Sequence, residues 1–261
     1  MNNFIQYEMT DGVALVTLNA PDTRNALMSE SEFGPIEEVC KRIQKDKGVR
    51  AVVITGAGKA FCAGGNIKNM LKRTQEPDAQ AIDDRYYYKE GFHRIPIALH
   101  GLEVPTIAAV NGPAIGAGLD LACMCDLRIA SESATFAESF VKLGIIPGDG
   151  GAWLLQKIVG VTKAAEMTFT GDTINAQEAL ACGLVSKVVP NTELLGEAMA
   201  LARRIAANPG YALRMSKRLI REAQTARLET ILEMSGGFQA LAHFTREHRE
   251  LVLKAVSRIS K

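Results

Sequence analysis

The most informative part of this 261-residue sequence is NGPAIGAGLD, at positions 111–120. It follows an apolar run at 106–110 that predicts a buried strand, and its small residues predict a tight turn that leads into a helix. Small residues let the backbone approach a ligand closely, and the first N–H groups of a helix lack partners within it. A ligand-binding loop is therefore predicted, although a plain strand-to-helix connection has the same composition.

A second segment, KAFCAGGNIK at 59–68, has the same character and follows the β-rich run 49–55. If the two turns lie together, one N–H from each makes an oxyanion hole for a thioester oxygen. Neither segment is a nucleotide-binding loop. Lys59 is followed by alanine where a magnesium-binding hydroxyl is needed, and Gly112 to Gly118 does not have the GxGxxG spacing.

The composition is that of an ordinary globular protein, with 47% hydrophobic residues, 23% charged residues and a net charge of +1. That charge balance favours a small-molecule partner over nucleic acid or a membrane surface. The five cysteines are scattered, which predicts free core thiols rather than a zinc site or disulfides. The polar N-terminus lacks a signal pattern, and the longest uncharged run, 104–119, is broken by proline and glycine. We expect a soluble, cytoplasmic protein.

Apolar runs predict strands at 13–18, 49–55, 106–110, 126–130 and 184–189. Helical spacing of apolar residues predicts helices at 29–46 and 78–99, and mainly helices beyond residue 148. Alternating strands and helices indicate an α/β core with substantial parallel pairing. We therefore expect a core domain at 1–200 and a helical C-terminal region at 201–261.

Both small-residue segments resemble signatures of the enoyl-CoA hydratase/isomerase (crotonase) superfamily. Residues 59–68 are similar to its KAFxAGxDIK-type loop, and 111–126 to its NG…G-small-G-x-[ED] stretch, which leads into a CD strand. Further matches are LGIIPGDGG at 143–151, AQEALACGLV at 176–185, and Asn208-Pro209 followed by Lys217. The resemblance spans nearly the whole chain and consists of several motifs in the family's order.

This resemblance implies a ββα spiral core whose helical C-terminal region completes the site and trimerises, often into a dimer of trimers. It implies acyl-CoA thioester substrates, no metal, and no cofactor beyond the coenzyme A of the substrate itself. Neither nucleic acid nor a membrane is an expected partner. The oxyanion N–H donors fall on Gly65 and Ala117, and Arg24 lies in the loop that follows the CoA phosphates and adenine. Further substrate contacts are expected at Ala26, Ala63, Asn66 and Ile67.

The acid and base positions depart from the hydratase pattern. A carboxylate beside the acidified α-carbon of a thioester can move a proton, and hydratases of the family use two glutamates. The first position is Asp120 here, and the second is Phe140, which cannot transfer a proton. We expect Phe140 either to make the acyl site drier or simply to fill the core. Glu138 falls at a non-catalytic position, where a surface or structural role is expected.

Asp149 lies beside Gly148, the position at which several isomerase members carry their aspartate. Two interpretations stay open, because aspartate also caps helices well and a helix is predicted from Gly150 to Ile158. Asp149 is therefore a candidate proton-transfer group or an N-cap.

Hydration and double-bond isomerisation remain competing functions, with thioester hydrolysis a more distant one. A non-catalytic CoA- or RNA-binding protein is a further alternative, disfavoured by the near-neutral charge and the intact loops. Residues 86–88 are three tyrosines, of which one or two could line an acyl tunnel, because successive helix residues point in different directions. The basic run 214–221 predicts a charged helix face, with contact to the CoA 3′-phosphate as the alternative.

Overall fold

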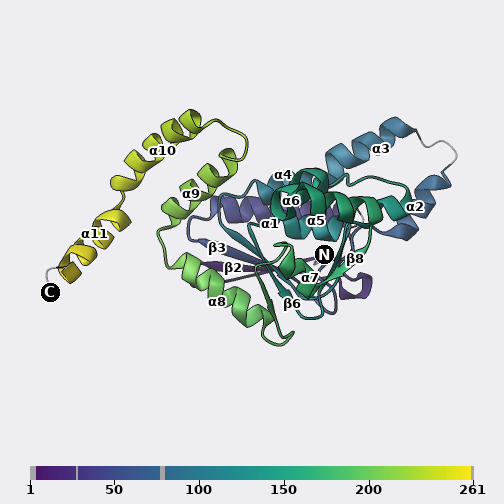
Figure 1. Ribbon diagram of the computed structural model, residues 1–261, viewed down its shortest axis with the longest axis horizontal. Coiled ribbons are helices and arrows are strands. Elements are labelled where there is room, and N and C mark those ends of the chain that lie inside the picture. The colour runs from purple at the N-terminus through teal and green to yellow at the C-terminus, as the bar shows by residue number, and fades with distance from the viewer. Residues whose placement is uncertain (1–3, 28, 77–79, 260–261) are drawn as a thin grey trace.

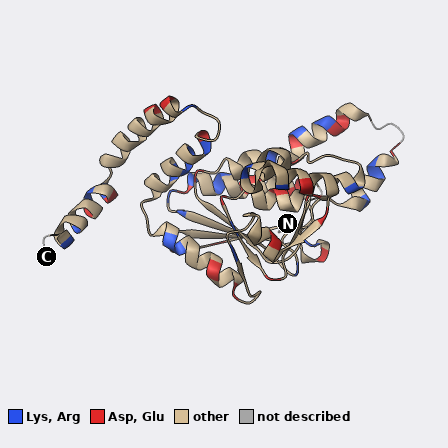
Figure 2. Ribbon diagram, in the orientation of Figure 1, with Lys and Arg blue, Asp and Glu red and all other residues tan. Residues whose placement is uncertain are grey.

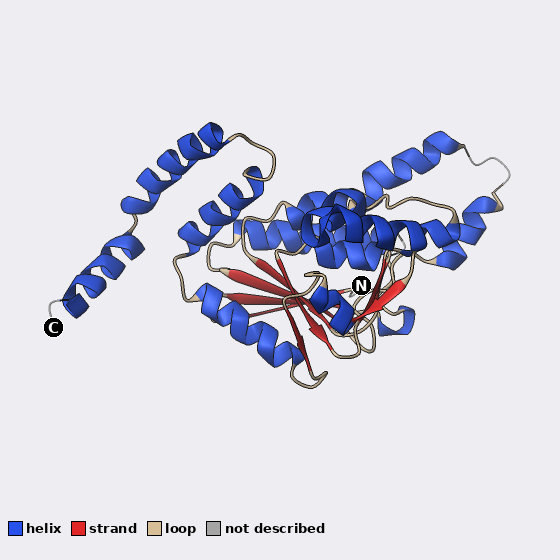
Figure 3. Cartoon of the chain, viewed as in Figure 1, coloured by secondary structure: helices blue, strands red, loops and turns tan. Residues whose placement is uncertain are grey.

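The computed structural model describes residues 4–27, 29–76 and 80–259. Its main sheet has six strands in the order β1-β2-β3-β4-β6-β9, and helices cover both faces (Figures 1 and 3). The strands of this sheet are β1 (Ile5–Thr10), β2 (Val13–Leu18), β3 (Ala51–Gly56), β4 (Thr106–Val110), β6 (Leu127–Ser131) and β9 (Lys187–Val189). A smaller sheet joins β5 (Ala114–Ile115), β7 (Thr135–Ala137) and β8 (Thr173–Asn175).

The strands from β2 to β9 pair in parallel, and only β1 runs antiparallel to its neighbour in the main sheet. Parallel strands that are buried on both faces are apolar throughout, and β4 is completely buried. Because β3 and β4 are adjacent and parallel, the segments that follow them leave the sheet at the same edge. This topology brings the two small-residue segments together.

One face of the main sheet is covered by helices from the middle of the chain: α1 (Glu30–Lys45), α4 (Arg94–His100), α5 (Ala117–Cys123) and α6 (Gly151–Thr170). Helix α8 (Leu194–Ala206) covers the other face through Ala198, Ala202 and Ala206. It therefore packs on the sheet on both sides of residue 200, where we placed the domain boundary. Short helices η1 (Pro21–Thr23), α2 (Ile67–Thr74), α3 (Ala81–Tyr87), η2 (Tyr88–Phe92), η3 (Ser139–Leu143) and α7 (Ala176–Ala181) connect these elements.

The last three helices are α9 (Gly210–Glu222), α10 (Leu228–His243) and α11 (Arg246–Ile259). Helix α9 contacts the core, whereas α10 extends away from it and α11 keeps a contact, the ion pair of Glu247 with Arg50 at 2.9 Å (Figure 1). Neither α10 nor α11 has a buried residue. In the described part of the chain, no helix is both long and apolar enough to cross a membrane.

The predicted strands at 13–18 and 106–110 are confirmed to the residue, and the helix at 29–46 is α1 with its two capping residues. Ser29 and Glu32 form a capping box there, which explains the start of α1. The helical stretch predicted at 78–99 is helical where the structure describes it, but it is not one regular α-helix. Residues 78 and 79 lie outside the described residues, and the remainder divides into α3, the π-helical turn η2 and α4. Strands β1, β5, β7 and β8 were not predicted.

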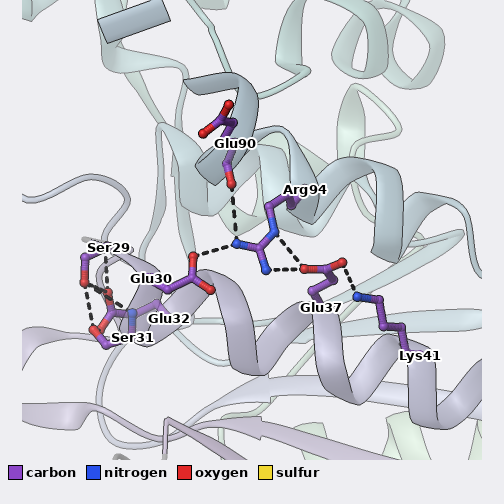
Figure 4. A network of polar contacts seen from close by, with 8 residues as sticks. All are labelled: Ser29, Glu30, Ser31, Glu32, Glu37, Lys41, Glu90 and Arg94. Carbon is purple, nitrogen blue, oxygen red and sulfur yellow. Dashed lines mark hydrogen bonds and ion pairs between the residues drawn. The ribbon is translucent and has the colours of Figure 1, made fainter. Parts of the chain in front are cut away.

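Arg94 fixes this divided helix against α1 (Figure 4). Its guanidinium donates to Glu37 at 2.7 Å and to Glu30 at 2.6 Å, and also to the carbonyl of Glu90 at 3.4 Å. Glu37 also pairs with Lys41. Exposed ion pairs contribute little individually, but a network with a forked arginine restrains geometry. The side chains of η2, among them Tyr88 and Phe92, therefore have a defined position relative to α1.

Candidate active site

The loops after β3 and β4 are hydrogen-bonded to each other. The N–H of Cys62 donates to Pro113 O at 3.1 Å, and the N–H of Ile115 donates to Cys62 O at 3.1 Å. Glycines permit this contact, because a Cβ on Gly64 would collide with Ile115 O and a Cβ on Gly118 would collide with Cys62 O. Gly64 also has a φ of +83°, which disfavours other residues. The small residues were predicted to let the backbone come close to a ligand. In the structure they let the two loops come close to each other.

Gly65 and Ala117 each present a backbone N–H at this junction. Ala117 is the first residue of α5, so its N–H has no acceptor within the helix. Within the described ranges, neither N–H donates a hydrogen bond. Ala117 N lies 3.4 Å from the point that a Cβ on Gly64 would occupy, one residue before Gly65. The two N–H groups therefore belong to adjacent segments of backbone and are free to bind another acceptor.

The loop that contains Arg24 and Ala26 lies alongside the first of these segments. Ala63 N–H donates to Arg24 O at 2.9 Å, and Leu27 N–H donates to Gly64 O at 2.9 Å. The Arg24 side chain is exposed, whereas Ala26 is buried. Asn25 was overlooked in the sequence, yet its buried amide donates to the carbonyls of Ala57, Ala60 and Phe61. Its φ of +59°, tolerated by asparagine, was not visible in the sequence.

Asn66 begins α2 as its N-cap, with its side-chain oxygen accepting from Lys68 N–H at 2.8 Å. Asn66 and the exposed Ile67 also border a cavity of about 450 Å³ that reaches Gly65. The half-buried Ala63 is not among its lining residues. Thus the first loop forms one end of a cavity of the size that small-molecule ligands occupy.

The other walls of this cavity are mainly apolar and aromatic. Tyr87, Tyr88 and Phe92 contribute rings, with Tyr88 stacked on Phe92 at 5.5 Å between centroids, and Leu27, Met70, Leu143 and Ile145 contribute aliphatic side chains. Tyr86 points elsewhere, which confirms that at most two of the three tyrosines line one cavity. A cavity of about 460 Å³ between α6 and α9 contains no residue of either loop.

Asp120 is fully buried on α5, three residues after Ala117. Its Oδ2 accepts from the N–H of Gly151, in the first turn of α6, at 3.1 Å. Burial, reinforced by the nearby carboxyl groups of Glu138 and Asp149, raises the pKa of Asp120 well above its usual value. Burial therefore favours the neutral acid form of Asp120.

Glu138 is not at the surface, so that part of the prediction is wrong. It is completely buried, and its carboxyl group lies within hydrogen-bonding reach of that of Asp120. Burial raises the pKa of Glu138 to about 8. Glu138 lies between β7 and η3, and this position brings its side chain to Asp120. A carboxylate between a short apolar strand and a turn is too weak a signal to reveal this burial.

Asp149 is not an N-cap, and that alternative is wrong. Gly150 occupies the cap position of α6 and has no side chain to contribute. Asp149 is 4% exposed, and its Oδ1 has no hydrogen-bond partner among the described residues. Burial raises its pKa to about 7. A group that titrates near neutrality can accept and release protons at physiological pH.

Neither Asp120 nor Asp149 lines the 450 Å³ cavity. Tyr88 is the wall next to Asp149, because its ring lies 3.1 Å from the position that a Cβ on Gly148 would take. Phe140 covers the loop after β4: its ring lies 3.6 Å from the position that a Cβ on Gly116 would take. Phe140 is buried but is not among the residues that line the 450 Å³ cavity, so a core position is what the structure shows, and its role as a dry wall of the acyl site stays a prediction.

The basic run 214–221 is not a single solvated face. Arg214 and Lys217 are each 6% exposed and anchor α9 to the core. Lys217 Nζ lies 2.6 Å from Asp126 and donates to Val104 O at 2.7 Å, and Arg214 donates to Asp46 O at 3.0 Å. Arg218 faces solvent and pairs with Glu222. Neither buried cation is available to a CoA phosphate.

No group of three or more His, Cys, Asp or Glu side chains in the described part of the chain is arranged to hold a metal ion. The four buried cysteines and the half-buried Cys182 are free thiols. Burial raises the pKa of Cys62 to about 12, so the thiol beside the first loop is not a nucleophile at neutral pH. Beside the two loops, the groups whose pKa values are shifted towards neutrality are the carboxyls of Glu138 and Asp149.

An α/β fold with two interlocked loops, two free backbone amides and buried carboxyls is the architecture of the crotonase-like enzymes. The chain belongs to the enoyl-CoA hydratase/isomerase family, whose model matches residues 8–252. It is 34% identical to a 1,2-epoxyphenylacetyl-CoA isomerase from Escherichia coli over 96% of this chain and 94% of the relative. It is 40% identical to a short-chain-enoyl-CoA hydratase from Clostridium acetobutylicum, over 89% and 86% respectively.

Solved structures agree with the fold. A putative enoyl-CoA hydratase/isomerase from Mycobacterium abscessus superposes with a TM-score of 0.90 at 30% identity, over 97% of this chain and 96% of the other. An enoyl-CoA hydratase from Bacillus anthracis superposes with a TM-score of 0.89 at 33% identity, over 98% and 96%. The expected crotonase-like α/β fold is therefore confirmed.

Proposed function

We propose that this protein is an acyl-CoA enzyme that stabilises a thioester enolate between the N–H groups of Gly65 and Ala117. The observation that carries this proposal is the hydrogen-bonded junction of two loops, which leaves one unpaired amide on each. Negative charge develops on a thioester oxygen when a proton leaves the α-carbon. Donors already positioned at that oxygen stabilise the charge without reorganisation.

Asp120 and Asp149 supply the proton transfers. Asp149, with a pKa of about 7, is the base, and the protonated Asp120 is the acid. The cavity lined by Tyr87, Tyr88 and Phe92 holds the acyl group. Because the two carboxyls lie behind its walls, the thioester has to extend past Gly65 and displace Tyr88 to reach Asp149.

Double-bond isomerisation is favoured over hydration by one observation. Phe140 stands where family hydratases carry their second glutamate, and its ring packs over Gly116, immediately before Ala117. An apolar ring beside the reacting carbon excludes water and suits a proton shuttle between carbons. Among the relatives, one is named a 1,2-epoxyphenylacetyl-CoA isomerase and another a short-chain-enoyl-CoA hydratase.

The rest of the substrate and the assembly follow from exposed features. Arg24 is exposed next to the first loop, where it can contact the phosphates or adenine of CoA.

We also propose that α10 and α11 pack against further copies of the chain as a trimer or a dimer of trimers. Figure 2 shows few charged residues along α10, and its exposed side chains include Leu228, Leu232 and Leu241.

A panel of 2-enoyl-, 3-enoyl- and aryl-CoA esters tests the reaction. Absorbance of the conjugated enoyl thioester falls on hydration and rises on isomerisation of a 3-enoyl ester, while release of free thiol reports hydrolysis. Asp120→Asn should lower turnover by at least about 100-fold, and Asp11→Asn, an exposed turn residue, should not. Calorimetric binding of acyl-CoA without turnover of any ester would favour a non-catalytic protein.

Ala117→Pro tests the oxyanion hole. Proline is tolerated at the first position of a helix, but it removes the N–H that we assign to the enolate oxygen. We expect kcat to fall by about 10²–10³-fold, as for loss of one oxyanion donor. Ala81→Pro, at the first position of α3, is the matched control and should keep activity. A folded Ala117→Pro enzyme with wild-type kcat would remove the basis of the proposal.

A further inference from the structure

Asp120 and Glu138 come together because residue 151 has no side chain. A Cβ on Gly151 would collide with Asp120 Oδ1 and also with Glu138 Oε1, so both oxygens crowd one point above the first turn of α6. Three separate elements meet there: Asp120 comes from α5, Glu138 follows β7, and Gly151 begins α6. The contact is therefore a product of the tertiary fold.

The facing oxygens have nothing else to bind. Asp120 Oδ1 and both carboxyl oxygens of Glu138 are buried without a hydrogen-bond partner among the described residues. Across the same residues, no lysine or arginine pairs with either carboxyl group. Two ionised carboxylates in such contact would repel each other in a region of low dielectric. A proton held between them converts that repulsion into a hydrogen bond.

We infer that Asp120 and Glu138 share a proton, and that Glu138 is a positioning residue which keeps Asp120 in its acid form. This inference rests on the proposed function, in which Asp120 is the acid. When Asp120 delivers its proton, its O–H bond breaks, a C–H bond forms on the substrate, and the enolate charge passes to the carboxyl group. The Gly151 N–H then supports that charge at Oδ2. Asp149 accepts the proton that leaves the substrate, and its return to the pair restores the starting state.

Other titratable groups face this pair. Asp149, from the turn before α6, acts on both carboxyls and raises their pKa values further. Cys123, on the same helix as Asp120, is buried, which raises its own pKa so that it remains a neutral thiol. Burial raises the pKa of Asp149 to about 7, that of Glu138 to about 8, and that of Asp120 well above its usual value. Near pH 8 we therefore expect Asp149 to be largely ionised and the pair to keep one proton.

Infrared spectroscopy of the protein without substrate tests the shared proton. At about pH 8 the exposed carboxyls are ionised, so the C=O stretch of a carboxylic acid should arise mainly from the pair. We expect this band to lose at least half its intensity in Glu138→Gln and to be unchanged in Glu132→Gln, an exposed residue nearby. The absence of the band in the wild type, or its persistence in Glu138→Gln, would overturn the inference.

The pH profile tests positioning. Without the glutamate, Asp120 loses its proton more easily, so the alkaline fall of kcat should move to lower pH by about one unit or more in Glu138→Gln. KM should stay within about twofold, which a general structural defect would not produce. An unmoved alkaline limb in a folded variant contradicts positioning. If Glu138→Gln does not fold, the presence or absence of the carboxylic-acid band in the wild type still tests the shared proton. The infrared result does not require turnover, so it can fail or succeed independently of the proposed function.

Discussion

At the scale of single residues, Asp149 is the carboxyl group that our proposal makes the base. It is buried beside Tyr88, and burial raises its pKa to about 7. A carboxylate with an ordinary pKa would be a weak base towards carbon, whereas one near neutrality is effective. The charged form is needed for proton removal, so activity should require pH values above the pKa of Asp149.

We predict that kcat/KM of the wild type falls about tenfold per pH unit below about pH 7, because Asp149 becomes protonated there. Asp149→Asn should lower kcat at least about 100-fold across the range and abolish this acid limb. Steady-state kinetics on the preferred ester provide the measurement, with Asp11→Asn as control. An acid limb that persists in an active Asp149→Asn enzyme would assign the base to another residue.

At the scale of elements, the contact between the two loops depends on where β3 and β4 end. The sequence predicted both strands and both turns, because strand propensity and small-residue turns are local properties. It did not predict the π-helical η2, which places Tyr88 and Phe92 on the cavity wall. Periodicity alone favours a continuous helix there, and the packing of η2 against α1 overrides it.

Helix α9 illustrates a second element whose role depends on packing. Its Lys217 is buried against Asp126, and burial lowers the pKa of Lys217 to about 8. From sequence, a run of basic residues on a helix predicts a solvated face. The facing carboxylate belongs to a residue far away in the chain, so the pairing was not visible in the run itself.

We predict that Lys217→Met destabilises the protein by about 2 kcal/mol, because the Val104 carbonyl loses its donor and Asp126 loses an ion-pair partner. Arg218→Met, which removes an exposed cation from the same helix, should cost less than about 1 kcal/mol. Urea unfolding monitored by circular dichroism compares the two. Equal stabilities of the two variants would show that the Lys217–Asp126 pair does not hold α9 in place.

At the scale of the whole molecule, α10 and α11 leave apolar side chains in solvent. Leu232 and Leu241 are 60% and 66% exposed, and Phe244 is 93% exposed. Exposed apolar patches of this kind mark contact surfaces. The family resemblance implies that other copies of the chain cover them.

We predict that Leu232→Glu combined with Leu241→Glu yields a monomer, because buried charges without partners would oppose association. Sedimentation velocity should show a trimer or hexamer for the wild type and for Glu229→Gln, a control on the same helix. A wild-type monomer, or a double variant that still assembles, would exclude α10 as the contact surface.

The sequence by itself determined the features that arise from neighbouring residues. These are the strands at 13–18 and 106–110, the capped helix α1, and two turns of small residues that can approach closely. Tertiary packing alone set which distant polar side chains meet and which of them are withdrawn from water. Glu138 joins Asp120, and Lys217 joins Asp126, because parallel strands and the helices that cross them bring distant segments into one interior. There, exclusion from water changes the charge of a carboxyl or an amine, and such exclusion cannot be read from neighbouring residues alone.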